Sequence, residues 1–119
     1  MTPTPDTQFP CAMVSGVPVV VTPGEIDITN ADGLETALLE SSEHGHGRLV
    51  VDMSRTRFCD TAGLHALVGA HKRALAEGGE VRLVIPDAAV QRIFALTGLD
   101  QVIPNFTSLH EALPQPPAS

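Results

Sequence analysis

Short apolar segments alternate with helical patterns along nearly the whole chain, and this alternation limits the folds that the chain can adopt. Segments rich in β-branched or other apolar residues occur at 9–14, 17–22, 49–51 and 81–85, and such segments are typical of strands. Strands that alternate with helices form parallel pairs joined by right-handed crossovers. The sequence therefore predicts a small α/β sandwich with a mixed, mostly parallel sheet of about five strands and about four helices.

The first two apolar segments predict an antiparallel hairpin. Ser15 and Gly16 separate them, and glycine is favoured in tight hairpin turns. Pro10 and Pro18 favour an edge position or a strand start, because proline cannot donate a hydrogen bond to a ladder. We expect the hairpin to precede the parallel part of the sheet.

Four segments carry helix signals. Their expected N-caps are Thr29, Asp60, Asp87 and Ser108. The expected inward-facing residues are Leu34, Ala37 and Leu38; Leu64, Leu67, Val68, His71 and Leu75; Val90, Ile93 and Phe94; and Leu109 and Leu113. Gly98 is expected to end the third helix in the left-handed conformation, and Val102-Ile103 to form a short last strand.

A length of 119 residues with 43% apolar residues is sufficient for one domain with its own core. Proline-rich, polar ends at 1–7 and 114–119 are expected to be disordered tails. We therefore expect the domain to span about 8–113. Cys11 and Cys59 lack metal-ligand spacing, and we interpret both as small buried apolar residues.

Net charge and composition exclude several classes of partner. The formal charge is −7 and Trp and Tyr are absent, so neither a basic phosphate-binding patch nor a base-stacking platform is expected, and nucleic acid is excluded. The apolar run 17–21 is far shorter than the ~20 residues that cross a bilayer, so membrane insertion is excluded. The first residues lack signal-peptide features, and we expect a cytoplasmic protein.

The segment from Arg57 to Leu64 is the strongest candidate for a functional site. A loop there enters a helix that begins Asp60-Thr61-Ala62-Gly63. Helix N-termini carry unpaired N–H groups and about half a positive charge, so a phosphate on the Thr61 hydroxyl would lie in a favourable field. From spacing alone, Asp60 and Thr61 could equally serve only to cap the helix.

Several motifs, in order and with intact spacing, resemble the STAS domain family. They are Gly24–Asp27, Leu49–Ser54, Phe58–Leu64, Gly78–Gly79 and Val90–Leu99. The resemblance covers about residues 17–113, and within the family it is closest to the anti-sigma factor antagonists.

The resemblance implies a phosphorylated binding module. It implies that Thr61, directly after the motif residue Asp60, is phosphorylated by a partner anti-sigma factor, a serine-threonine kinase of the histidine-kinase-like ATPase type. The family's second hydroxyl position is Ala62 here, and His65 stands where many members have glycine. The implied partner-binding residues are Glu25, Asp27, Asp60, Thr61, Ala62, Gly63 and His65. We expect no enzymatic activity, cofactor or metal, and a monomer when free.

Three other functions have partial support in the sequence. A regulatory STAS subunit of a lipid-type ABC transporter is the alternative from the same family. Asp52, near the end of a strand, could be the phosphoacceptor of a receiver domain, but the acidic pair that would hold Mg²⁺ after the first parallel strand is missing. His44 and His46 could ligate a metal, but no third ligand lies near them in the sequence.

Overall fold

A five-stranded sheet forms the centre of the computed structural model, which describes residues 9–114. In spatial order its strands are β1 (Cys11–Val14), β2 (Val17–Val21), β4 (Arg48–Asp52), β6 (Glu80–Val84) and β7 (Asn105–Phe106). The β1–β2 hairpin is antiparallel and the other three pairings are parallel. A second, two-stranded parallel sheet pairs β3 (Glu25–Ile26) with β5 (Phe58–Cys59). The predicted fold class is confirmed, whereas the small second sheet was not predicted.

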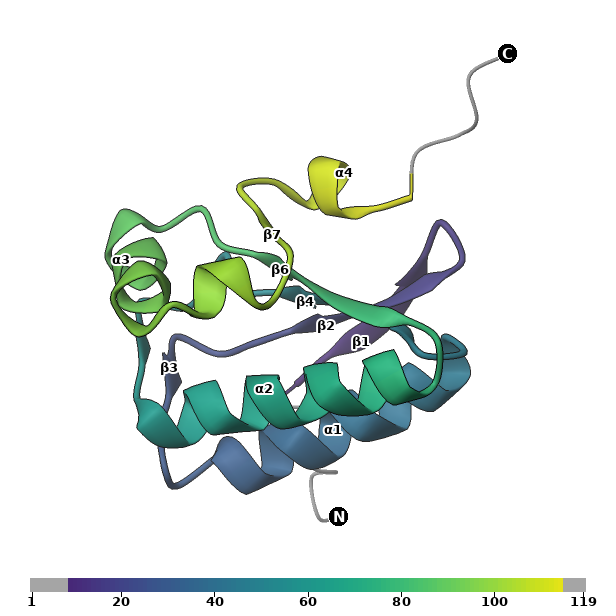
Figure 1. The fold of residues 1–119 in the computed structure, drawn as a ribbon, viewed down its shortest axis with the longest axis horizontal. Coiled ribbons are helices and arrows are strands. Elements are labelled where there is room, and N and C mark those ends of the chain that lie inside the picture. The colour runs from purple at the N-terminus through teal and green to yellow at the C-terminus, as the bar shows by residue number, and fades with distance from the viewer. Residues whose placement is uncertain (1–8, 115–119) are drawn as a thin grey trace, which may run out of the picture.

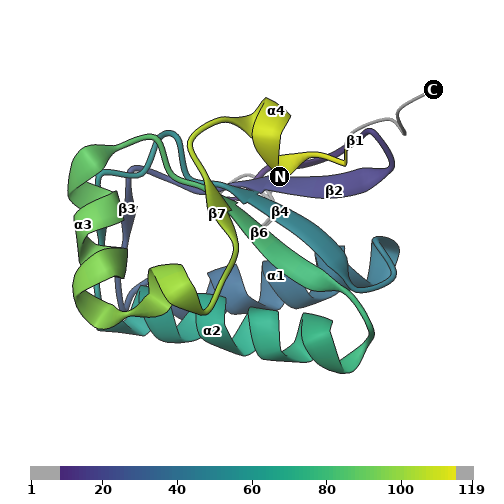
Figure 2. The same cartoon turned by 45° about the horizontal axis from the view of Figure 1, so that its top comes forward.

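The helices are arranged in layers around the central sheet. Their bounds are α1 (Ala31–His44), α2 (Thr61–Ala76), α3 (Ala88–Thr97) and α4 (Leu109–Ala112), with a short 3-10 helix, η2 (Leu99–Gln101), after α3. Helices α1 and α2 lie side by side against one face of the sheet, and α4 lies on the opposite face (Figures 1 and 2). Helix α3 stands at the end where β3 and the start of α2 lie. No helix in residues 9–114 is long and apolar enough to cross a membrane.

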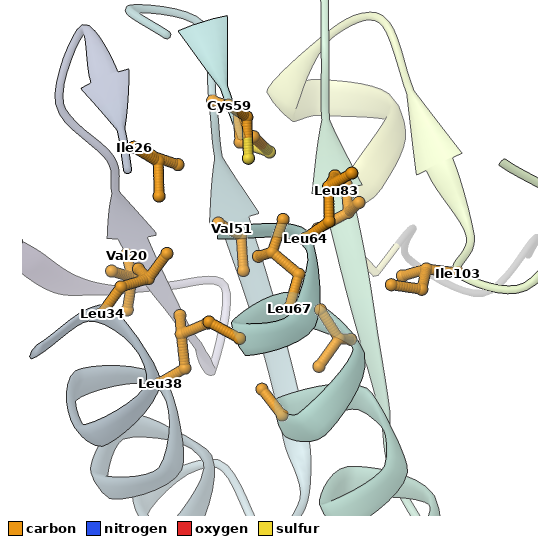
Figure 3. Close-up of a cluster of buried hydrophobic side chains, with 14 of the residues drawn as sticks. Val20, Ile26, Leu34, Leu38, Val51, Cys59, Leu64, Leu67, Leu83 and Ile103 are labelled. Atoms are coloured by element: carbon orange, nitrogen blue, oxygen red, sulfur yellow. The ribbon is translucent and has the colours of Figure 1, made fainter. Parts of the chain in front are cut away.

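The main core fills the space between the sheet and helices α1 and α2 (Figure 3). Because side chains alternate along a strand, Val20 and Val51 point into this core while Val19 and Val50 point to the other face. On that other face a smaller cluster packs under α4, where Ala112 is fully buried. Each face of the sheet thus carries an apolar cluster, as expected for a mostly parallel sheet that is covered on both faces.

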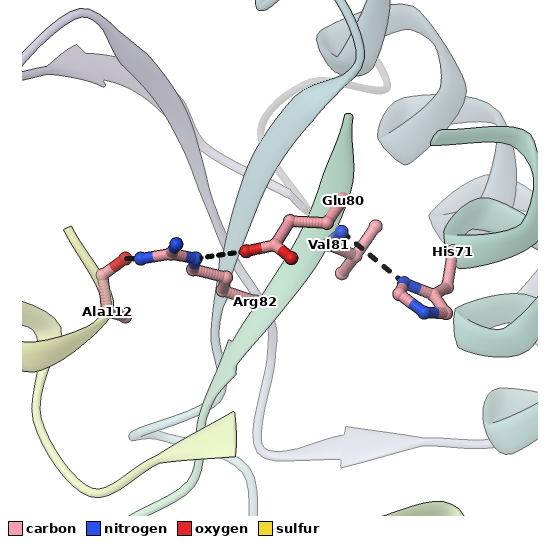
Figure 4. Close-up of polar contacts among 5 residues, drawn as sticks. All are labelled: His71, Glu80, Val81, Arg82 and Ala112. Carbon is pink, nitrogen blue, oxygen red and sulfur yellow. Dashed lines mark hydrogen bonds and ion pairs between the residues drawn. The ribbon is translucent and has the colours of Figure 1, made fainter. Parts of the chain in front are cut away.

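Polar contacts join α2 and α4 to strand β6 (Figure 4). The backbone N–H of Val81 donates to Nδ1 of the buried His71, over 3.4 Å. On the other face Arg82 donates to Glu80 and, over 3.2 Å, to the carbonyl of Ala112. His71 therefore belongs to the α2–β6 packing, and Arg82 fixes α4.

Three of the four predicted N-caps are confirmed: Asp60, Asp87 and Ser108 each accept a backbone N–H of the first turn. The prediction of Thr29 was wrong, because α1 begins after Asn30. Thr29 instead donates to Asp27, and the Asn30 amide bonds to the backbone of Asp27 and Glu25. These side chains close the loop rather than cap the helix.

Three burial or strand predictions were also wrong. Leu75 is exposed because the inward stripe of α2 passes through Ala74, about 100° away around the helix. Cys11 is exposed because β1 is the outermost strand, whereas Cys59 is buried as predicted; neither forms a disulfide. The last strand is β7 rather than Val102-Ile103, since the chain from Leu99 turns through η2 first.

Gly98 has the predicted left-handed conformation, with φ of 78°. The predicted tail 1–7 lies outside the described residues. Of the second predicted tail, 114–119, only Pro114 is described, and it is exposed. The proposed domain boundaries therefore stay a prediction.

Candidate functional site

The two-stranded ribbon β3/β5 brings together two loops that are distant in the sequence. Glu25 pairs with Phe58 and Ile26 with Cys59, and the Asp60 N–H extends the ladder by donating to the Ile26 carbonyl over 3.0 Å. Since the two strands are parallel, the segments that follow them leave the ribbon at the same end. There β3 continues into the loop before α1 and β5 continues into α2. The ribbon thus gathers the acidic loop and the start of α2.

Alternation along the ribbon determines which side chains are exposed. Ile26 and Cys59 are buried against the domain, so Glu25 and Phe58 point outward. Phe58 is 49% exposed, and Ile28, in the loop just after β3, is 79% exposed. Ile28 and Phe58 were not among the predicted site residues. Recognising the two-residue strands around Ile26 and Cys59 would have identified Phe58 by its alternation.

Thr61 is the first residue of α2 and is exposed at its positive end. Asp60 has an extended backbone, and its Oδ1 accepts the N–H of Gly63 over 3.1 Å. His65, one turn further along, is exposed on the same side as Thr61, while Ala62 is half-buried. The Thr61 hydroxyl is therefore presented to solvent in a field that favours an anion.

Charges of both signs lie close to Thr61 in the chain: the Asp60 carboxylate directly precedes it, and the exposed Arg57 lies four residues earlier. Asp27 accepts the N–H and the hydroxyl of Thr29, and these bonds hold the pKa of Asp27 below its usual value. The ion pairs Arg73–Glu77 and Arg82–Glu80 do not involve Glu25, Asp27 or Asp60. A phosphate on Thr61 would be favoured by the helix terminus and opposed by the neighbouring Asp60 carboxylate.

Cys59 is unsuited to act as a nucleophile. Burial, and secondly the neighbouring Asp60 carboxylate, raise the pKa of its thiol to about 12. The thiol remains protonated at neutral pH and serves as a small apolar group beneath Gly63.

The other candidate groups do not converge on a site. No cluster of three or more His, Cys, Asp or Glu side chains able to hold a metal exists in the part of the chain that the structure describes. His44 and His46 are exposed. Asp52 accepts hydrogen bonds from the N–H and the hydroxyl of Ser54, so its carboxylate closes its own loop.

Gly63 allows α2 to approach the ribbon. A Cβ at this position would lie 2.6 Å from Cγ2 of Ile26 and 2.7 Å from Sγ of Cys59, and both side chains are buried. These separations are too short for any real contact. The first turn of α2, and with it Thr61, can take its place only because residue 63 has no side chain.

We expect Gly63→Ala to reduce the free energy of unfolding by about 1–3 kcal/mol, because the added methyl group overpacks the junction. Chemical denaturation measures the change. Gly69→Ala is the matched control on the same helix, since its Cβ would meet only the carboxylate of Glu35, the end of a flexible side chain. An equal loss in both variants would contradict the special role of Gly63.

The fold and the site define a small α/β module whose exposed hydroxyl, carboxylates and apolar side chains gather at the end of one ribbon. Residues 11–112 match the STAS domain model, and the chain belongs to the STAS domain family. It is 31% identical over 99 residues to the anti-sigma-F factor antagonist RsfB of Mycobacterium tuberculosis, covering 83% of this chain and 80% of that protein.

Two further comparisons agree with this family. The anti-sigma-B factor antagonist of Bacillus subtilis is 31% identical over 80 residues, which are 67% of this chain and 72% of that one. The crystal structure of an anti-sigma factor antagonist from Mycobacterium paratuberculosis superimposes with a TM-score of 0.78 at 32% identity, covering 87% and 88% of the two chains. The resemblance inferred from the motifs is confirmed.

Proposed function

We propose that this protein is an anti-sigma factor antagonist that binds a kinase-type anti-sigma factor of the histidine-kinase-like ATPase class and is switched off by phosphorylation on Thr61. The names of relatives at 31% identity support the general function. The observation that carries the finer proposal is the position of Thr61, exposed at a helix N-terminus directly after the ribbon strand that presents Phe58. The paired strand leads into the loop that exposes Ile28.

The surface around Thr61 suits a protein partner. Ile28 and Phe58 supply apolar area that can be buried at an interface, and aromatic side chains are enriched where binding energy concentrates. Glu25, Asp27 and Asp60 would form an acidic rim that complements a basic partner surface. We place the partner contact on these residues together with Ala62, Gly63 and His65.

Phosphorylation would act on binding rather than on folding. It adds about −1.5 to −2 charges at Thr61. Within the free domain, the helix field favours the phosphate while Asp60 opposes it. At a docked interface the same dianion must lose its water, which is costly unless the partner supplies cations. The modified protein would then release the anti-sigma factor.

The remaining parts of the proposal follow from this role. The protein acts as a binding module without catalytic activity, cofactor or metal, in the cytoplasm, as a monomer when free. The domain that carries the function spans about residues 8–113.

Incubation with the anti-sigma factor and labelled ATP tests the proposal. We expect one phosphate per chain, located on Thr61 by mass spectrometry and absent in Thr61→Ala. Thr36→Ala, which removes an exposed hydroxyl from α1, is the control and should be labelled normally. Labelling of Thr61→Ala at the normal level would refute Thr61 as the acceptor. Capture of an ABC transporter subunit in place of the anti-sigma factor would favour the other role known in the family.

A further inference from the structure

Two buried threonines connect the loops that lead into the β3/β5 ribbon. Thr22 directly follows β2 and is 1% exposed, and Thr56 lies just before β5 and is 0% exposed. Their hydroxyl oxygens are 2.6 Å apart, and the Thr56 hydroxyl donates to the carbonyl of Pro23 over 2.7 Å. The two residues are 34 positions apart in the sequence, so the contact joins separate segments.

Counting protons gives this pair a direction. Each hydroxyl has one proton, and a carbonyl oxygen can only accept. The Thr56 proton is used on the Pro23 carbonyl, so in the 2.6 Å contact Thr22 donates and Thr56 accepts. The alternative acceptor for Thr22, the Asp52 carbonyl, is 3.4 Å away, at the long end of the range. The result is a relay from Thr22 through Thr56 to Pro23.

The relay lies where the ribbon joins the main sheet. Immediately beyond it, the Gly24 carbonyl accepts the N–H groups of Arg57 and Phe58, over 2.8 and 3.3 Å. The ribbon itself has two residues in each strand, and an isolated two-stranded pair is marginally stable at best. Its position must therefore be set by its attachments, which are the relay at the base and the burial of Ile26 and Cys59.

We propose that the Thr22–Thr56 relay is a positioning pair that holds the β3/β5 ribbon, and hence Phe58 and the start of α2, in the place required for partner binding. The pair does not touch the partner. Its effect on the ribbon is independent of the identity of the partner, whereas its effect on affinity rests on the proposed function.

Hydrogen exchange measures the effect on the ribbon. In Thr56→Val the Pro23 carbonyl loses its hydroxyl partner, and the Thr22 hydroxyl keeps only the long 3.4 Å contact with the Asp52 carbonyl. The base of the ribbon should therefore open more often. We expect exchange at the Phe58 and Asp60 amides to accelerate about tenfold more than at Leu83, whose amide donates within the main sheet to Pro104. Thr56→Ser, which restores a hydroxyl, should recover most of the protection.

The direction of the relay also predicts that the two threonine variants differ in their effect on hydrogen exchange. Thr22→Val removes only the first bond and leaves the bond to Pro23, so it should accelerate ribbon exchange less than Thr56→Val. The double variant should resemble Thr56→Val alone, because the Thr22 bond is already lost there. Ser42→Ala is the matched control, since Ser42 is a buried hydroxyl for which no partner is found in residues 9–114; it should leave ribbon exchange unchanged.

Affinity for the anti-sigma factor, measured by titration calorimetry, tests the functional part. We expect Thr56→Val to bind about tenfold more weakly and Thr56→Ser to bind nearly normally. Equal acceleration at the ribbon and at Leu83, or failure of Thr56→Ser to restore protection, would overturn the positioning role. Normal affinity of Thr56→Val despite a loosened ribbon would also overturn it. Failure of the unsubstituted protein to bind any anti-sigma factor would instead defeat the proposed function, and exchange alone would then decide on the relay.

Discussion

Thr61→Glu is expected to fold normally and to bind the anti-sigma factor about thirty-fold to several-thousand-fold more weakly. A carboxylate buried without a partner at an interface costs about 2–5 kcal/mol, which corresponds to this range in dissociation constant. In the free domain the side chain remains in water at the exposed start of α2. The helix field and the Asp60 carboxylate act on it in opposite directions, so the free energy of unfolding should change by less than about 1 kcal/mol.

Thr61→Gln separates charge from size in this experiment. Glutamine has the shape of glutamate without its charge, so the difference between the two variants measures the electrostatic cost alone. Affinities from titration calorimetry and melting temperatures of both variants give the result. Equal binding by Thr61→Glu and Thr61→Gln would show that charge at this position does not control the interface.

The architecture was largely predictable because its signals are local. Asp60 and Asp87 precede helical patterns as caps, and Gly98 follows one as a left-handed terminus. Each of these helix ends depends on hydrogen bonds within one turn, so the residues that form it are close together in the sequence and can be recognised there. The buried run Leu49–Val51 likewise marked a central strand.

Some of the errors occurred where contacts distant in the sequence decide the structure. The cap predicted at Thr29 is a different kind of error, because the bonds that close the loop before α1 are local: the Asn30 side chain bonds to the backbone of Asp27 and Glu25, three and five residues earlier. Cys11 is exposed only because β1 lies at the edge of the sheet. Strand order is a property of the whole topology, and local composition does not encode it.

The same distinction between local signals and long-range contacts separates the site residues that were predicted from those that were missed. Thr61, Asp60 and Gly63 were identifiable because the motif is continuous in the sequence. Ile28 and Phe58 were missed because their exposure depends on the β3/β5 pairing, which joins residues 33 positions apart. The two-residue strands are too short for an alternating pattern to stand out from the loops around them.

Ile28→Ser and Phe58→Ser are each expected to weaken binding of the anti-sigma factor about tenfold to a hundredfold. Burying a large apolar side chain contributes about 1.5–3 kcal/mol, and both side chains have exposed area left for an interface to cover. Ile28→Ser should leave the free energy of unfolding unchanged, since Ile28 is 79% exposed in the free domain. Phe58→Ser should reduce it modestly, since about half of the Phe58 side chain is already covered.

Leu75→Ser is the matched control for these two variants. Leu75 is 55% exposed and lies on α2, fourteen residues after Thr61, which at ~1.5 Å per residue places it about 21 Å along the helix. Loss of an exposed leucine there should not alter the affinity. Surface plasmon resonance of the three variants, with denaturation curves for each, separates the contributions to binding and stability. If Leu75→Ser weakens binding as much as Phe58→Ser does, the partner covers a face of α2 remote from the ribbon, and the surface assigned to the partner is wrong. If only the ribbon variants lose affinity, the apolar contact lies beside Thr61, where a single phosphate can interrupt it.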